Sequence, residues 1–293
     1  MKTKGFISSL LITSVIILTF GTALASQDIT STKVKESPAI DGVSNDKVWE
    51  GIKSFKVKDV RTEADVTIKS IYTDDMIYFL VKYPDATEDR LHKPWVWDNN
   101  LESYILGPQR EDTFTLKWNM MDHKVDLSSF SDDDYTADIW YWKANRTDPS
   151  GYADDKYDII SAVSQNKSQE VVSTTGKKRY LLRLSDEGNP SYQNIILTEY
   201  KGDIIDQFTH IKPSGSMGDI PAKGVWKEGV WTIEFGRKLD TGHSDDIRLS
   251  PKSGEKYLFG ISIPGLYGEP IDKKTAHWYG QGRISEPLFL IFK

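Results

Sequence analysis

Nitrogen and sulfur side chains of the kinds that bind transition metals are few in this chain of 293 residues, which has five histidines, five methionines and no cysteine. No two histidines stand at the spacing of a paired metal site, and an isolated histidine is usually a surface or satisfied core residue. His277 stands out because it directly precedes the last expected strand, next to Trp278. Met120 and Met121 follow another expected strand. A thioether is a soft metal ligand, and its alternative role is to fill gaps in a core.

The missing cysteines exclude whole classes of chemistry. The chain has no disulfide, no thiolate zinc site, no iron–sulfur cluster, no covalently attached c-type haem and no catalytic thiol. It also lacks the phosphate-binding glycine loop, the nucleophile elbow and the His-Glu-x-x-His zinc helix. A hydrolase that uses two carboxylates stays as a weaker alternative, because 43 acidic residues permit many pairs.

Aspartates gather at three places, Asp132–Asp134, Asp154–Asp155 and Asp245–Asp246. In an exported protein such groups could bind calcium. The spacing of an EF-hand is absent, and aspartate is a common turn former. The expectation for all three is therefore a solvated turn.

Alternating and apolar runs predict the elements that must position these side chains. Val66–Tyr72 and Ile77–Tyr83, joined by a turn at Thr73–Met76, predict a hairpin with a buried second strand. Further strands are expected at Thr113–Trp118, Arg179–Leu184, Val230–Phe235, Tyr257–Ile263 and Pro287–Phe292. One short helix is expected at Asn45–Gly51, capped by Asn45 or Ser44.

Short strands separated by Gly, Pro and Asp turns predict an all-β protein, a sandwich or a barrel. Residues 84–112 and 119–160 read as long irregular stretches, which are commonly functional. No linker or repeat divides the chain, so a single domain is expected over residues 26–293.

The N-terminus has the pattern of a secretory signal peptide. Lys2 and Lys4 precede the apolar run Phe6–Phe20, and Ala23-Leu24-Ala25 fits a cleavage site after Ala25. The alternative is an uncleaved membrane anchor, for which the apolar run is short. Loss of both lysines changes the net charge from −6 to −8. We therefore expect a periplasmic or secreted acidic protein that avoids nucleic acid and anionic lipid.

Residues 138–155, with the sequence DIWYWKANRTDPSGYADD, resemble a signature of the haem-binding family typified by the gamma subunit of ethylbenzene dehydrogenase. Weaker matches are Gly229–Asp246 and Tyr257–Ile263. Ile40–Val43 with Val48-Trp49 resembles the opening of the same sandwich superfamily, which includes carbohydrate-binding modules.

The resemblance implies an immunoglobulin-like antiparallel β-sandwich that holds haem b without a covalent bond. It implies electron transfer rather than catalysis, beside a periplasmic molybdenum oxidoreductase or a cytochrome. Characterised gamma subunits hold the iron by a Met and a Lys. Leu127–Ser131 occupies the expected Met position, so Met120 or Met121 is the candidate here. On the other side Lys274 or His277 is expected, with His277 favoured because neutral imidazole binds iron at pH 7.

The same resemblance assigns further residues to the cofactor. Trp140 and Trp142 share one face of an extended segment and are expected to wall the haem slot. Lys143 and Arg146 are expected to pair with the haem propionates, and Trp278 to lie at the same site. The alternative is a core Trp pair with a surface Lys and Arg.

A second functional class is a carbohydrate- or other ligand-binding module without haem. Trp95, Trp97, Trp140 and Trp142 fall in the stretches read as irregular, where aromatic rings could stack on a sugar.

Overall fold

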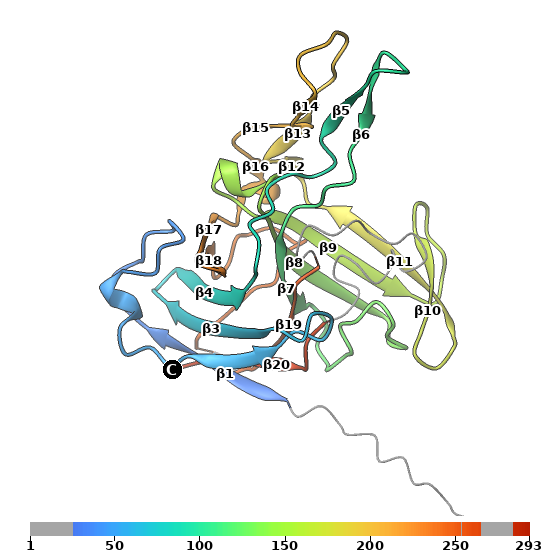
Figure 1. Cartoon of the computed structure of the whole chain (residues 1–293). Coiled ribbons are helices and arrows are strands. Elements are labelled where there is room, and N and C mark those ends of the chain that lie inside the picture. The colour runs from blue at the N-terminus through green and yellow to red at the C-terminus, as the bar shows by residue number, and fades with distance from the viewer. Residues whose placement is uncertain (1–25, 253, 265–283) are drawn as a thin grey trace, which may run out of the picture.

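The computed structural model describes residues 26–252, 254–264 and 284–293 and is built almost entirely of β-strands (Figure 1). The main sheet contains β1 (Gln27–Lys33), β2 (Phe55–Lys58), β3 (Asp65–Tyr72), β4 (Met76–Pro84), β7 (Thr113–Asn119), β8 (Tyr135–Lys143), β9 (Asp154–Ser161), β10 (Gln169–Val172), β11 (Lys178–Ser185), β17 (Ala222–Lys227), β18 (Val230–Lys238), β19 (Tyr257–Ser262) and β20 (Leu288–Phe292). Three smaller sheets are formed by β5 (Trp95–Asp98), β6 (Ser103–Leu106) and β14 (Ile204–Ile205), by β12 (Gly188–Asn189) and β16 (Ser214–Gly215), and by β13 (Tyr192–Asn194) and β15 (Phe208–His210).

The main sheet folds over on itself into the two layers of a sandwich. Its strand order is β10–β11–β9–β8–β7–β19–β20–β1–β3–β4–β18–β17, with β2 beside β3. Aromatic contacts join the two halves of this order. The ring centres of Phe79 on β4 and Trp118 on β7 are 5.6 Å apart, and those of Trp142 on β8 and Trp231 on β18 are 4.8 Å apart. The predicted all-β sandwich is confirmed.

Strand β1 links the two layers by pairing in parallel with both β20 and β3. Every other strand pair in the described residues is antiparallel. The expected antiparallel sandwich therefore contains two parallel strand pairings, both made by β1.

The expected hairpin is confirmed as β3 and β4, and the other expected strands appear as β7, β11, β18, β19 and β20. Strand β4 is buried on both faces, because Trp49 packs with Tyr78 and Leu80 on its outer side.

The expected helix at Asn45–Gly51 is wrong in extent. The structure has one 3-10 turn, Lys47–Trp49, with Asp46 at its N-cap and no side-chain capping bond. This turn is anchored by tertiary contact, since the Trp49 indole N–H donates to Glu234 Oε1 at 2.9 Å.

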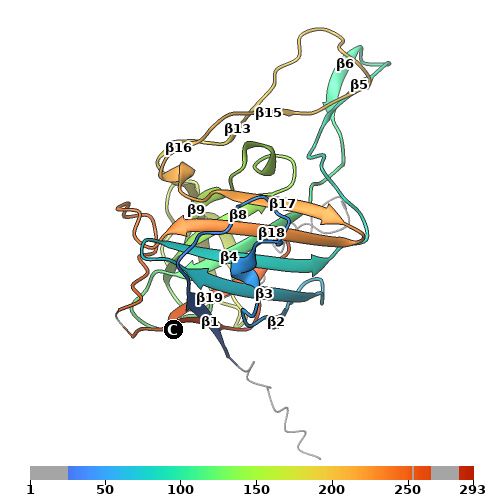
Figure 2. The ribbon, with the colours of Figure 1, turned by 90° about the vertical axis from the view of Figure 1, so that its left-hand side faces the viewer.

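The two stretches read as irregular also contain strands. Residues 84–112 include β5 and β6, and residues 119–160 include β8 and β9. Charged residues obscured the second pair, since Asp138, Lys143 and Asp155 interrupt the apolar pattern and are nevertheless buried. Strands β5, β6 and β14 form an arm that projects from the sandwich in two perpendicular views (Figures 1 and 2).

Candidate functional site

The signature at residues 138–155 folds as β8, a 3-10 turn at Asp148–Ser150, and β9. Side chains alternate across a strand, so Asp138, Trp140 and Trp142 share one face of β8 and Lys143 the other. In the register of the two strands, Asp155 lies opposite Trp140 and Asp154 opposite Tyr141. The signature therefore presents side chains on both faces of this layer.

Trp140 and Trp142 fill the space between the two layers, and both are 0% exposed. The Trp140 ring centre lies 5.2 Å from that of Trp118, and the Trp142 indole N–H donates to Asp148 Oδ1 at 2.9 Å. Neither tryptophan borders the pockets described below. Here they act as core residues, and their expected place at a haem stays a prediction.

Lys143 and Arg146 are brought together beside Tyr192, and each has an acidic partner inside the protein. The Lys143 ammonium pairs with buried Asp154, and burial lowers the pKa of Lys143 to about 8 although Asp154 opposes the shift. Arg146 pairs with Glu111, and its guanidinium lies 5.6 Å from the Tyr192 ring centre. These pairs account for the burial of both cations, and their contact with haem propionates stays a prediction.

Met120 and Met121 follow β7 and line a pocket of about 490 Å³, which we call the methionine pocket. The Met121 Sδ accepts a hydrogen bond from the Thr136 N–H at 3.4 Å. His123 lines the same pocket, and its Nδ1 lies 2.8 Å from Asp122 Oδ1. The imidazole of His123 and the two thioethers, which are close in the sequence, thus line one pocket.

A larger pocket of about 810 Å³ adjoins the methionine pocket and shares Lys124 and Leu258 with it. We call it the apolar pocket. Its lining includes Val60, Val125, Leu127, Phe130, Phe259 and Pro287. Its size lies within the range of about 300–1,000 Å³ for small-molecule and cofactor sites.

Lys274, His277 and Trp278 lie in residues 265–283, outside the described residues. The description resumes at Ile284 and Ser285, both of which line the apolar pocket. The predicted roles of the three residues stay predictions.

The donor set around the two pockets fits a haem held without a covalent bond. Apolar side chains suit the porphyrin faces, a methionine thioether is a known axial ligand, and Lys124 brings a positive charge to the wall shared by both pockets. Sequence analysis missed Val125, Leu127 and Leu258 as lining residues. The alternation in Val125-Asp126-Leu127 signals one buried face, but nothing local distinguishes Leu258 from other strand residues.

Among the described residues, no helix has the length and apolar character needed to cross a membrane.

A family model described as ethylbenzene dehydrogenase matches residues 27–263. No curated protein matches the chain significantly. Solved structures similar to it include a family 9 carbohydrate-binding module from Caldicellulosiruptor kristjanssonii in complex with glucose, at 11% identity and a TM-score of 0.41, covering 91% of this chain and 97% of that one. The same kind of module in complex with cellotriose matches at 12% identity and a TM-score of 0.41, covering 91% of this chain and 95% of that one. A putative carbohydrate-binding protein from Bacteroides uniformis matches at 9% identity and a TM-score of 0.36, covering 91% of this chain and 100% of that one.

Proposed function

The chain belongs to the ethylbenzene dehydrogenase family, and from this premise we propose that it binds one haem b without a covalent bond and carries electrons. The observation that supports the proposal is the apolar pocket of about 810 Å³ directly beside Met120 and Met121. The absence of cysteine excludes the thioether attachment of a c-type haem and agrees with haem held without a covalent bond.

The residues that would hold the haem fall into two groups. Val125, Leu127 and Leu258 provide apolar surface and exclude water, and Met120 or Met121 provides a thioether for the iron. Bound haem would supply a one-electron carrier whose potential depends on its axial ligands. His277 stays our proposal for the second ligand.

The family is of the subunit or binding-domain type, so the chain is a binding domain rather than a catalyst. We propose that residues 1–25 direct export and that the mature domain works outside the cytoplasm. An acidic carrier with a net charge of −8 after loss of Lys2 and Lys4 would dock on a basic surface of a molybdenum oxidoreductase or a cytochrome, less tightly at high salt.

Absorption spectroscopy tests the haem proposal. We expect the exported protein, produced with ample haem, to show a Soret band, or to bind added haemin in the micromolar range or tighter. Met120→Leu or Met121→Leu should change the ferric and ferrous spectra. Met217→Leu is the matched control, because Met217 is buried away from both pockets. Absence of haem from the protein, together with no binding of haemin, would refute the proposal.

A second candidate, binding of a carbohydrate or another ligand, is favoured by a ring cluster on the projecting arm. The ring centre of Trp97 lies 5.1 Å from that of Tyr104 and 5.1 Å from that of Tyr200, which is 54% exposed. Trp140 and Trp142 are removed from this candidate because neither is exposed. Binding to a polysaccharide that is lost in Trp97→Ala, in a protein that takes up no haemin, would favour it over haem.

A further inference from the structure

Four aspartates from four parts of the chain meet in a buried position between the layers. Asp138 lies on β8, Asp155 on β9, Asp186 after β11 and Asp246 after β18. They are 0%, 0%, 5% and 7% exposed. One carboxylate oxygen from each of Asp138, Asp155 and Asp246 lies within 4.8 Å of the others, and the carboxyl group of Asp186 adjoins that of Asp155. We call these four residues the aspartate cluster.

Several oxygens in the aspartate cluster have no hydrogen-bond partner among the described residues. They are both oxygens of Asp155, both oxygens of Asp186, and Oδ1 of Asp138. Buried polar atoms are nearly always hydrogen-bonded, and an exception calls for a missing ion or water. One of the two unpartnered oxygens of Asp155 points into the cluster, since it lies within 4.8 Å of an oxygen of Asp138 and of an oxygen of Asp246.

The charge of the aspartate cluster is only partly compensated. Arg237 is 0% exposed, and its Nη1 lies 3.1 Å from Asp138 Oδ2 while its Nη2 lies 3.0 Å from Asp246 Oδ1. One guanidinium faces four carboxyl groups, so a bound cation would compensate more of their negative charge.

We propose that Asp138, Asp155, Asp186 and Asp246 bind one calcium ion. Calcium takes oxygen ligands at about 2.3–2.6 Å, so two ligand oxygens on opposite sides of the ion lie about 5 Å apart. The separation of at most 4.8 Å between the oxygens of Asp138, Asp155 and Asp246 meets that condition. The cluster offers carboxylate oxygens and no nitrogen or sulfur, which selects a hard cation over zinc or copper.

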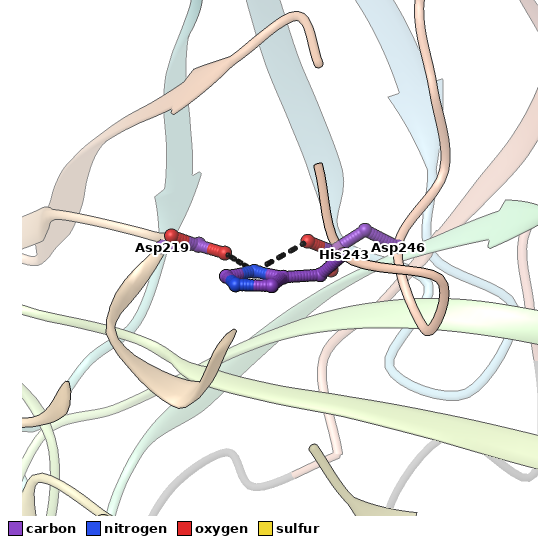
Figure 3. Close-up of side chains that lie close together, drawn as sticks. All are labelled: Asp219, His243 and Asp246. Carbon is purple, nitrogen blue, oxygen red and sulfur yellow. Dashed lines mark hydrogen bonds and ion pairs between the residues drawn. The ribbon is translucent and has the colours of Figure 1, made fainter. Parts of the chain in front are cut away.

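His243 lies between Asp219 and Asp246, one member of the aspartate cluster (Figure 3). Its Nδ1 lies 2.6 Å from Asp219 Oδ2 and 3.8 Å from Asp246 Oδ2. The Asp219 carboxylate accepts a hydrogen bond from His243 Nδ1 and thereby raises the pKa of His243. His243 therefore forms an ion pair at the rim.

A surface pocket is lined by residues that flank two of the cluster aspartates in the chain. This pocket of about 580 Å³ is lined by Ser185, Glu187, His243 and Asp245, which include the chain neighbours of Asp186 and Asp246. Its acidic lining would attract a cation.

Protons are the competing occupants. Burial and neighbouring carboxylates raise the pKa of Asp186 to about 8, and burial raises that of Asp138 to about 6 despite Arg237. A cluster without a cation would hold these protons instead, so an experiment must detect calcium itself.

Calorimetric titration of calcium chloride into the full-length exported protein, after treatment with a chelator, tests the proposal. We expect one calcium per chain, with a dissociation constant of about 10⁻³ M or tighter. Terbium should emit on excitation of tryptophan, because the Trp140 indole nitrogen lies 3.4 Å from Asp138 Oδ2. Asp155→Asn and Asp186→Asn should each weaken calcium binding by about tenfold or more.

Asp74→Asn is the control, since that side chain is 89% exposed and distant in sequence from the cluster. Circular dichroism shows which variants fold, and two independent variants guard against one that does not. The proposal fails if the wild-type protein gives neither calcium heat nor terbium emission. It also fails if the folded cluster variants bind calcium as the wild type does. No outcome depends on haem, so the calcium site and the haem proposal can fail separately.

Discussion

Asp154 and Asp155 are neighbours in the chain, yet their side chains leave β9 on opposite faces and enter two separate buried groups. Asp154 lies opposite Tyr141 and pairs with Lys143. Asp155 lies opposite Trp140 and faces Asp138 and Asp246. The alternation of a strand places one carboxylate with a cation and the next among carboxylates.

Asparagine substitutions should separate these two roles. Asp154→Asn leaves the Lys143 ammonium buried without its carboxylate, and we expect a loss of about 3–5 kcal/mol in the free energy of unfolding. Burial and the neighbouring Asp138 raise the pKa of Asp155 well above its usual range, so its carboxyl group is costly to bury, and in the presence of a chelator we expect Asp155→Asn to leave stability unchanged or raise it. Urea unfolding of both variants measures the difference. Equal losses in the two would contradict this assignment.

Gly224 on β17 should tolerate no larger side chain while Trp142 is present. A Cβ at this position would lie 2.4 Å from Trp142 Cζ2. We expect Gly224→Ala to lower the free energy of unfolding by about 1–3 kcal/mol, as overpacking does. In a chain that also carries Trp142→Leu, Gly224→Ala should lower the free energy of unfolding by less than it does in the wild type. A double-mutant cycle by urea unfolding measures this coupling, and additive effects would rule out the contact.

We expect buried His92 to make the protein less stable in mild acid. Burial, together with Arg146 and Lys93, lowers the pKa of His92 from 6.5 to about 2. The Glu111 carboxylate, 3.2 Å away, is already paired with Arg146. Below pH 6.5 the unfolded chain gains a proton at His92 that the folded chain does not. The contribution of His92 to the free energy of unfolding is therefore complete above pH 6.5 and declines below it. The slope approaches about 1.4 kcal/mol per pH unit.

His92→Gln tests this dependence. Urea unfolding between pH 7.5 and 5 should show a smaller decline for the variant than for the wild type, because glutamine does not titrate. Parallel curves for the two proteins would show that His92 is protonated when folded.

A charge in the apolar pocket should weaken haem binding. Phe130 lines the apolar pocket, so Phe130→Asp would place a carboxylate against the porphyrin, and we expect about a tenfold or larger loss of affinity. Haemin titration followed at the Soret band measures the change. Val163→Asp is the matched control, since Val163 is 71% exposed and borders neither pocket. Equal haemin affinity in the two variants would show that the apolar pocket is not the haem site.

Much of the fold could be predicted because its cause is local. Alternation in Val66–Tyr72 and the turn after it define β3 and β4 without knowledge of their neighbours. The signature at residues 138–155 identified the family for the same reason, since it can be read directly from the chain. Prediction was weakest where charge lies inside the protein. Asp154 and Asp155 were expected in a solvated turn, and both are buried in β9.

The candidate site could be predicted only in part. Met120 and Met121 were named from the sequence, but the apolar pocket beside them forms from segments as far apart as Val60 and Pro287. The sequence by itself determined several of the strands, the acidic charge and the absence of thiol chemistry, because these follow from residue type and local order. Only the tertiary structure decided which charges are buried and what they face. Asp138 is stabilised by Arg237 from the opposite layer, and no local pattern encodes a partner 99 positions away in the chain.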